Sequence, residues 1–134
     1  MIQLGPAQLR WAHQIDRLFA SVQDALIPPG ARLESIAERM ADPGRILRVA
    51  RKGETLLGAL DGRIEGDRGS IAQLAVAQDV RFRGVGKALV EAFASEARSE
   101  GARLLEAWVI DPESEGFWLS MSFERDPDGA YRRT

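Results

Sequence analysis

The chain has 134 residues, of which 45% are hydrophobic and 28% are charged, and its formal net charge is −2. This length and composition predict one globular domain over residues 1–134 and argue against a disordered chain. The sequence contains no cysteine and a single histidine, His13. Disulfides, thiolate nucleophiles and multi-histidine metal sites are therefore excluded, and we expect no metal cofactor.

The net charge and the apolar runs also restrict the partners and the location of the protein. Proteins that neutralise nucleic-acid phosphates are usually basic, so a net charge of −2 argues against nucleic acid as a partner. No apolar run approaches the roughly 20 residues that a membrane-spanning helix needs. The start of the sequence, MIQLGPAQLR, lacks the pattern of a signal peptide. We therefore expect a cytoplasmic protein that contacts no membrane.

The amino-terminal part of the sequence predicts a short strand and two helices. Residues 2–4 are a short stretch with apolar Ile2 and Leu4, which is typical of a first strand. From Pro6 to about Ala25, apolar residues recur at three- and four-residue steps, which predicts a helix that Pro28-Pro29-Gly30 ends. A second helix is predicted from about Ala31 to Met40, and Asp42-Pro43-Gly44 follows it.

Strands are predicted for the middle of the chain. Ile46–Ala50 and Thr55–Leu60 are predicted strands, and the short segment between them fits a hairpin turn. Asp61-Gly62 is a turn signal, and the polar stretch from there to Gly69 is left unassigned. Ser70–Val76 is predicted to be the next strand, with apolar residues at alternate positions in its second half.

The rest of the chain predicts a helix, a strand, a short helix and a hairpin. The first helix runs from Val85 to about Arg98, with Gly101 as its C-cap. Leu104–Val109 is a predicted strand, Pro112–Met121 a short helix and Phe123–Arg132 a final hairpin. Because a strand–helix–strand unit joins parallel neighbours, the pattern predicts a mixed α/β (α+β) fold. A ligand site is expected at the carboxyl ends of the parallel strands.

The loop that precedes the long helix has the features of a diphosphate-binding loop. Gly84 and Gly86 carry no side chain where the backbone must approach a ligand. The helix that begins there directs free N–H groups and the positive end of its dipole to the same place. Arg81, Arg83 and Lys87 add positive charge. The alternative is a glycine-containing helix start with solvated basic side chains.

Two spaced motifs carry a family resemblance. Leu74-x-Val76, a four-residue gap and Arg81-x-x-Gly84-x-Gly86-x-Ala88 match at every position the signature of the GNAT superfamily of acetyl-CoA-dependent N-acetyltransferases, which this chain resembles. Further along, the family pattern Asn-x-x-Ala-x-x-Phe-Tyr-x-x-x-Gly-Phe aligns without a gap to residues 111–123. Four positions of that pattern differ, with Asp111 for Asn, Ser114 for Ala, Trp118 for Tyr and Ser122 for Gly.

The resemblance implies a central mixed sheet with parallel, splayed strands flanked by helices. It implies that acetyl-CoA is the acetyl donor and that an amine is the acceptor. The strand before the loop would bind the pantetheine arm through free backbone groups of Leu74, Ala75 and Val76, and Trp118 would contact the cofactor. The implied diphosphate contacts are the N–H groups of Arg81, Phe82, Arg83, Gly84, Val85, Gly86 and Lys87.

The implied reaction is the direct attack of a neutral amine on the thioester. The Leu74 N–H would polarise the carbonyl, and Glu106 or Asp111 would accept the proton of the amine. Each of these carboxylates is also typical of a solvated surface. The family tyrosine often protonates the departing thiolate, but the indole of Trp118 does not transfer a proton. Trp118 is therefore expected to be chiefly a packing residue, and Tyr131 is the one tyrosine of the chain.

Two functions stay open at this point. The first is an active acyltransferase that acetylates an amine of a small molecule or a protein. The second is a catalytically degenerate CoA-binding module that acts in regulation or partner binding, which the departures from the family pattern motivate. The acceptor is not identified, its pocket would be built by residues 6–45 and 53–69, and a homodimer is one oligomeric state left open. Acidic side chains that would attract an amine, or simply be solvated, are Asp24, Glu34, Glu38 and Asp61.

Overall fold

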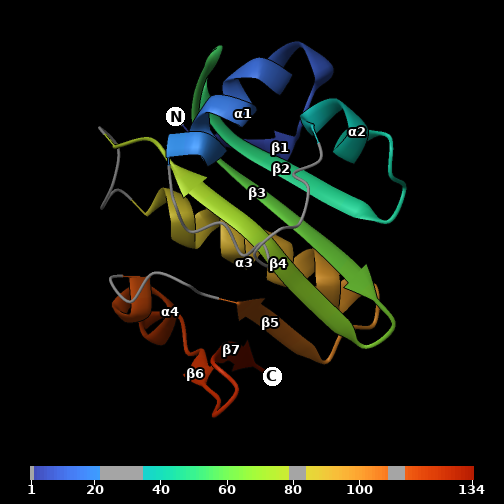
Figure 1. The fold of residues 1–134 in the computed structure, drawn as a ribbon, viewed down its shortest axis with the longest axis vertical. Coiled ribbons are helices and arrows are strands. Elements are labelled where there is room, and N and C mark those ends of the chain that lie inside the picture. The colour runs from blue at the N-terminus through green and yellow to red at the C-terminus, as the bar shows by residue number, and fades with distance from the viewer. Residues whose placement is uncertain (1, 22–34, 79–83, 109–113) are drawn as a thin grey trace.

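The fold is built on one mixed β-sheet. The computed structural model describes residues 2–21, 35–78, 84–108 and 114–134, and these residues form a seven-stranded sheet in the order β1-β2-β3-β4-β5-β7-β6 (Figure 1). Among the described strands, β4 and β5 are parallel and the other neighbours are antiparallel. The strands are β1 (Gln3–Pro6), β2 (Arg45–Lys52), β3 (Thr55–Glu65), β4 (Arg68–Val76), β5 (Leu104–Trp108), β6 (Glu124–Arg125) and β7 (Ala130–Arg133).

Helices cover both faces of the sheet. A 3-10 turn, η1 (Leu9–Trp11), leads into α1 (Ala12–Ser21), and α2 (Ile36–Met40) comes before β2. The long helix α3 (Val85–Ser99) connects β4 to β5 and crosses behind β3 and β4 in Figure 1, and α4 (Glu115–Ser120) follows β5. The predicted mixed α/β fold, with a parallel strand pair and flanking helices, is confirmed.

The sheet separates two hydrophobic clusters. On one face, Leu89 and Phe93 of α3 pack with Ile71 of β4. On the other face, Ile15 of α1 packs with Ile36 of α2. Each of these five side chains is 2% exposed or less. We call the two groups the α3 cluster and the α1 cluster, and the central strands contribute side chains to both.

The start of the first helix differs from the prediction. Pro6 is the last residue of β1, opposite Arg48, rather than the first residue of a helix. An edge strand accepts proline because the missing N–H can lie on the side that faces solvent. The helical conformation begins at Leu9, as a 3-10 turn. The apolar periodicity was therefore correct, but it extended the helix too far toward the amino terminus.

The second helix begins later than predicted. Ser35 is extended and caps α2, so the helix starts at Ile36 rather than near Ala31. The Ser35 hydroxyl accepts from the Glu38 N–H at 3.1 Å, and the Glu38 carboxylate accepts from the Ser35 N–H at 3.5 Å. This reciprocal capping box defines the start of a short helix. The predicted end of the first helix near Ala25, like Ala31, lies outside the described residues.

The predicted turn at Asp61-Gly62 is wrong. Both residues lie inside β3, which continues to Glu65, and the turn into β4 is at Gly66, where φ is 59°. Asp61 is 1% exposed and forms ion pairs with arginine side chains. These tertiary contacts override the local turn preference of an Asp-Gly pair. The stretch to Gly69 that was left unassigned is therefore the end of a long hairpin.

The carboxyl-terminal elements follow the prediction closely. α3 starts at Val85, and Gly101, with φ of 98°, lies just past its end. The Ala102 N–H donates to the carbonyl of Ala97 at 2.9 Å, which completes a Schellman motif. β6 and β7 form the predicted final hairpin. The predicted strand end at Val109 and the predicted helix start at Pro112 lie outside the described residues.

Helix α4 ends in a second Schellman motif, in which a serine takes the glycine position. The Phe123 N–H donates to the Trp118 carbonyl and the Ser122 N–H to the Leu119 carbonyl, both at 3.1 Å. Ser122 has φ of 67° and is the one non-glycine residue with positive φ in the described part of the chain. The left-handed conformation costs a residue with a side chain about 1–2 kcal/mol. Position 122 therefore stores backbone strain.

Replacing Ser122 by glycine should stabilise the protein. We expect Ser122→Gly to raise the free energy of unfolding by about 0.5–1 kcal/mol, because the relieved strain exceeds the added entropy of the unfolded chain. Urea unfolding measures the change. Ser120→Gly, at the last residue of the same helix, is the matched control and should lower the free energy of unfolding by about 0.5 kcal/mol. A similar loss in both variants would contradict strain at Ser122.

Candidate functional site

Strand β4 pairs with β5 over only the first part of its length. Their register runs from Arg68 opposite Leu104 to Ile71 opposite Ala107. β4 then continues to Val76 in register with β3, whereas no further pairing with β5 occurs among the described residues. Figure 1 shows the two strands separating toward the arrowhead of β4. Beyond Ile71, β4 therefore has an edge that β5 leaves open.

A β-bulge in β4 coincides with this separation. The register of β3 and β4 shifts at Ala72, which is skipped in the pairing with β3. Because of this extra residue, Ile71 and Leu74 both pack against the α3 cluster, whereas Ala75 packs in the α1 cluster. In a regular strand, residues three apart point to opposite faces. The bulge therefore sets the orientation of the rest of β4.

The open edge of β4 carries polar backbone groups. The Ala77 N–H donates to the Leu57 carbonyl of β3 at 2.8 Å. Successive residues of a strand direct their N–H and C=O groups to alternate edges, so the groups of Ala75 also face β3. Those of Leu74 and Val76 then face the edge from which β5 has separated. These two residues can hydrogen-bond an extended ligand through the backbone.

The start of α3 lies next to the end of β4. Gly84 is the N-cap, with a left-handed φ of 77°, and its carbonyl accepts from the Ala88 N–H at 2.9 Å. Gly86 is in the first turn, where an added Cβ would lie 3.1 Å from Phe117 and 3.5 Å from Val76. Glycine is thus favoured at both positions, by backbone conformation at Gly84 and by the limited space at Gly86.

The other residues of the predicted loop are described only in part. Val85 is 1% exposed and belongs to the α3 cluster, so it anchors the start of the helix. Lys87 is exposed in the first turn of α3. The first N–H groups of a helix have no partner within the helix, and the dipole adds positive potential there. Arg81–Arg83 lie outside the described residues, so their predicted contacts stay predictions.

Glu106 lies on β5, on the face away from α3, because both of its neighbours along the strand belong to the α3 cluster. Its carboxylate accepts from Arg132 Nε at 2.8 Å and lies 3.8 Å from a nitrogen of Arg68. Its side chain is 7% exposed. Both arginines contact the same carboxylate oxygen, Oε2. Asp111, the other predicted base, lies outside the described residues.

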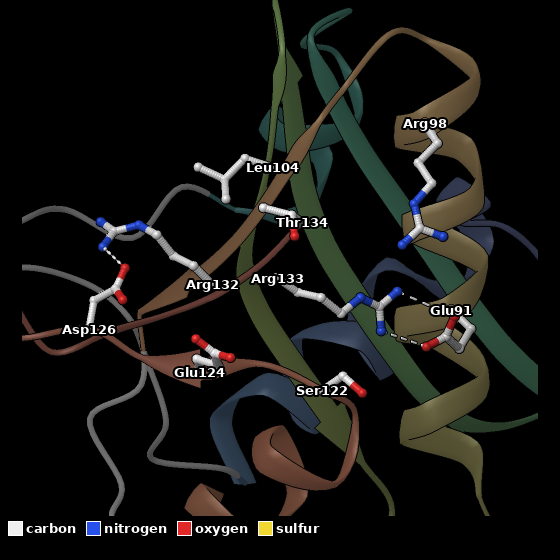
Figure 2. Close-up of a pocket in the computed structure, with 9 residues that line it drawn as sticks. All are labelled: Glu91, Arg98, Leu104, Ser122, Glu124, Asp126, Arg132, Arg133 and Thr134. Carbon is white, nitrogen blue, oxygen red and sulfur yellow. Dashed lines mark hydrogen bonds and ion pairs between the residues drawn. The ribbon is translucent and has the colours of Figure 1, made fainter.

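A separate pocket of about 680 Å³ lies between α3 and the carboxyl-terminal hairpin (Figure 2). Arg133 of β7 reaches toward Glu91 of α3, with a nitrogen–oxygen distance of 2.7 Å, and Arg132 pairs with Asp126 on another side of the pocket. None of the predicted site residues that the structure describes lines this pocket. Because its charged groups largely pair with one another, we assign it no function.

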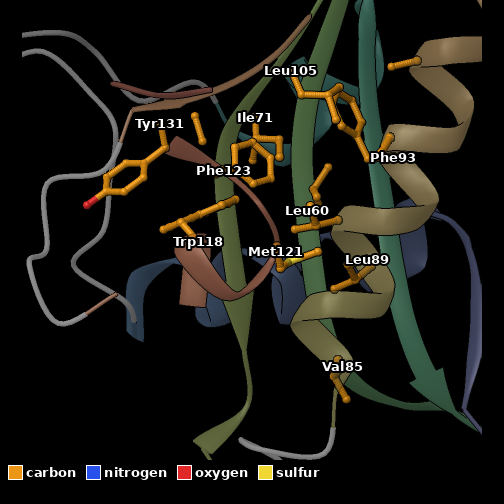
Figure 3. Close-up of a cluster of buried hydrophobic side chains, with 14 of the residues drawn as sticks. Leu60, Ile71, Val85, Leu89, Phe93, Leu105, Trp118, Met121, Phe123 and Tyr131 are labelled. Atoms are coloured by element: carbon orange, nitrogen blue, oxygen red, sulfur yellow. The ribbon is translucent and has the colours of Figure 1, made fainter. Parts of the chain in front are cut away.

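Trp118 of α4 is a core residue. It is 5% exposed, and its ring packs edge-on against those of Phe117 and Phe123, with centroid distances of 5.0 and 5.2 Å. Figure 3 shows it beside Phe123 and Tyr131 within the α3 cluster. The indole thus has a packing role, as the sequence led us to expect, and its contact with a cofactor stays a prediction.

Phe117 of α4 lies near the start of α3 and was not among the predicted site residues. It is partly exposed and packs against the first turn of α3, close to where a side chain at Gly86 would lie. Its signal was present in the sequence, because it is the phenylalanine that precedes the tyrosine position of the family pattern. Phe117 therefore lies at the candidate site, together with the end of β4 and the start of α3.

The acidic residues considered for attracting an amine have structural partners where they are described. Glu38 caps α2. The Asp61 Oδ2 atom accepts from Arg39 at 3.1 Å and from Arg45 at 2.9 Å. Burial raises the pKa of the Asp61 carboxyl, while the two guanidinium groups oppose that rise. The remaining two, Asp24 and Glu34, lie outside the described residues.

The single histidine and the single tyrosine of the sequence both lie in described elements. His13 is exposed on α1, and Tyr131 is 4% exposed on β7, opposite Ala107. Across the described ranges, no three His, Cys, Asp or Glu side chains are grouped closely enough to hold a metal ion. None of the helices in the described part of the chain has both the length and the apolar character needed to cross a membrane.

Comparison with known proteins adds to this geometry. Residues 12–123 match the family model described as Acetyltransferase (GNAT) family. No curated protein gives a significant match to the sequence. The family match covers both motifs of the sequence, the open edge of β4 and the start of α3.

Solved structures share the fold. An acetyltransferase from Thermus thermophilus superposes with a TM-score of 0.75 at 24% identity, over 99% of this chain and 96% of that one. N-acetylglutamate synthase from Neisseria gonorrhoeae, in complex with coenzyme A and N-acetyl-glutamate, gives 0.82 at 16% identity, over 99% of this chain and 35% of that one. The ribosomal-protein-S18-alanine N-acetyltransferase from Escherichia coli gives 0.75 at 12% identity, over 98% and 91%.

The ion pairs around Arg132 give stability a defined pH dependence. Arg132 bonds Asp126 at 2.6 Å and Asp128 at 2.8 Å, in addition to Glu106. The hydrogen bonds from Arg132 and from the Ala130 N–H hold the pKa of Asp128 below its usual value. A carboxyl whose pKa is lowered by folding stabilises the protein above its unfolded pKa of about 3.9. That stabilisation is lost as the pH falls through the folded pKa.

We therefore expect wild type to lose more stability than Asp128→Asn when the pH falls from about 6 to about 3. Urea unfolding at the two pH values measures the loss in each protein. Asp16→Asn, which removes a carboxylate from the exposed face of α1, is the control and should behave like wild type. If Asp128→Asn loses as much stability as wild type, its ion pair contributes nothing to acid sensitivity.

Proposed function

The chain belongs to the acetyltransferase (GNAT) family, and on that premise we propose that it transfers the acetyl group of acetyl-CoA to a primary amine of a small molecule or a protein. The observation that carries this proposal is the open edge of β4 beyond Ile71, next to the glycine-containing start of α3. The edge offers backbone groups to an extended arm, and the helix start offers N–H groups to a diphosphate. Coenzyme A has both parts.

The described residues fit a coenzyme A thioester. Leu74 and Val76 direct backbone donors and acceptors to the open edge, which suits the amide groups of the pantetheine arm. The free N–H groups in the first turn of α3, together with Lys87, suit the diphosphate. Arg81–Arg83 join this set through the sequence motif. An N-acetylglutamate synthase of the same fold was solved with coenzyme A, which supports the same donor here.

Transfer would proceed by direct attack. The lone pair of the neutral amine forms the C–N bond at the thioester carbonyl carbon, while the Leu74 N–H donates to the carbonyl oxygen as it gains negative charge. One such donor is worth about 3–4 kcal/mol in the transition state. The C–S bond then breaks and the sulfur leaves as a thiolate. The proton of the amine passes to a base, for which Glu106 and Asp111 stay the candidates.

A catalytically degenerate coenzyme A-binding module is the second candidate, and one observation favours it. Trp118 is buried and stands where the family pattern has a tyrosine, and an indole does not transfer a proton. Turnover does not require that proton, because a thiol with a pKa of about 8.5 leaves tolerably as the thiolate. General acid catalysis contributes about 10²–10⁴-fold, so its loss slows transfer without abolishing it. We therefore favour the active enzyme.

Coenzyme A binding should depend on Gly84. A side chain at φ of 77° strains the N-cap and displaces the free N–H groups of α3. We expect Gly84→Val to weaken coenzyme A binding at least about tenfold in calorimetry, or about 1.4 kcal/mol. Gly53→Val is the matched control, because Gly53 also has positive φ, 61°, and open space at its Cβ, but lies in the β2–β3 turn. Unchanged affinity in a folded Gly84→Val protein would exclude the helix start from the site.

Acetyl transfer should not depend on the indole N–H of Trp118. Free thiol release from acetyl-CoA, with a panel of primary amines, measures turnover. Trp118→Phe should lower kcat by less than about tenfold, well below the full contribution of a general acid. The smaller ring should lower the free energy of unfolding by about 1–3 kcal/mol.

Two outcomes would contradict this prediction or the proposed activity. A hundredfold loss of kcat in a folded Trp118→Phe protein that binds coenzyme A normally would give the indole N–H a chemical role. Intact acetyl-CoA binding without thiol release for any amine of the panel would favour the degenerate module.

A further inference from the structure

A buried polar cluster lies at the bulge of β4. One guanidinium nitrogen of Arg39, on α2, donates to Asp61 Oδ2 at 3.1 Å and also to Gln73 Oε1. Asp61 and Gln73 are cross-strand partners on β3 and β4, beside the skipped residue Ala72. Arg39, Asp61 and Gln73 are 5%, 1% and 7% exposed. A single guanidinium therefore joins the two strands at the point where their register shifts.

Neighbouring groups hold this cluster in place. Arg45 of β2 donates to the same oxygen of Asp61 at 2.9 Å. The Phe19 ring of α1 lies with its centroid 5.6 Å from the guanidinium carbon of Arg39. Stability alone does not call for such a cluster, because apolar side chains of similar volume often stabilise a core as well or better. A hydrogen-bonded cluster favours one arrangement of the strands instead, since its bonds form only when donors and acceptors are in register.

The register at the bulge decides which backbone groups reach the open edge of β4. With Ala72 skipped, the Leu74 N–H faces that edge and the Gln73 side chain faces Arg39. A slip of one residue turns every following side chain to the other face of the sheet. Such a slip would also exchange the backbone groups that point to β3 for those that point to the open edge. The amide of Leu74 would then no longer face a ligand.

We propose that Arg39, Asp61 and Gln73 form a positioning clamp that fixes the bulge of β4 and thereby aims the Leu74 N–H at the thioester carbonyl. This inference rests on the proposed function, in which Leu74 is the oxyanion donor. The three side chains are positioning residues, because they act through the backbone of β4 and not on the reacting atoms. The clamp also connects α2 with β4. Helix α2 lies in the segment expected to build the acceptor pocket, and β4 is the strand that would bind acetyl-CoA.

The carbonyl stretch of bound acetyl-CoA, labelled with ¹³C at the thioester carbon, tests the clamp without an acceptor amine. A hydrogen bond to the carbonyl oxygen lowers the stretching frequency relative to free acetyl-CoA. Gln73→Leu removes the acceptor on β4 and keeps a similar side-chain volume. We expect its bound band to return at least halfway to the free position, while the Kd for acetyl-CoA changes by less than about threefold.

Turnover with the best amine of the panel gives a second readout. In Gln73→Leu, kcat should fall about tenfold, while KM for acetyl-CoA stays within about threefold of wild type, because the lost interaction acts in the transition state. Gln73→Glu keeps an oxygen acceptor for Arg39 and should retain the wild-type band. Arg48→Met is the matched control: it removes a partly buried arginine that joins β2 to α3 through Glu96, and it should leave the band unchanged.

The outcomes separate the clamp from the proposed function. A wild-type band in a folded Gln73→Leu protein overturns the clamp, and so does a wild-type protein whose bound carbonyl is unshifted. Should Gln73→Leu fail to fold, Asp61→Asn decides, since it keeps the side-chain shape but removes the charge that holds Arg39. Its band must move toward the free position, and a wild-type band there overturns the clamp. A wild-type protein that binds no acetyl-CoA overturns the proposed function itself.

Discussion

The short pairing of β4 with β5 is the constraint on which the rest of the structure depends. Among the described residues, four residue pairs join the two strands, and β4 then continues in register with β3 alone. Backbone N–H and C=O groups inside a protein need partners, and no described strand pairs with the outer edge of Leu74 and Val76, so that edge suits water or a ligand. The bulge at Ala72 and the glycine start of α3 both lie where β4 leaves its neighbour. Strand separation, bulge and helix start thus form one structural unit.

The sequence predicted correctly those elements whose determining residues lie within one continuous segment. The apolar stripe of α3 and its glycine end were readable because helix period and C-cap lie within one continuous segment. Asp61-Gly62 misled the prediction, because the partners that bury Asp61 come from α2 and β2, far away in sequence. Pro6 misled it for a related reason, since its place in an edge strand depends on pairing with Arg48.

The part of the candidate site that lies in one continuous segment, the glycine-containing start of α3, was predictable from the sequence. The glycine spacing located the start of α3, and the left-handed φ of Gly84 gives that signal a physical cause. The reason for Gly86 needed the structure, because Phe117, which limits the space there, comes from α4. The contacts of Arg39 could not be foreseen, since three elements must be assembled before its two acceptors meet.

The two hydrophobic clusters have no described residue in common. β4 nevertheless serves both, with Leu74 and Val76 toward α3 and Ala75 toward α1. Apart from the clamp residues Arg39, Asp61 and Gln73, the described side chains beneath α1 and α2 do not contact the α3 cluster that supports the start of α3, so substitutions among them leave that packing unchanged. In evolutionary terms, descendants of such a chain are free to diversify one side of the sheet while inheriting the other almost intact. Outside the clamp, one strand with two separately packed faces thus allows the two sides of the fold to change at different rates.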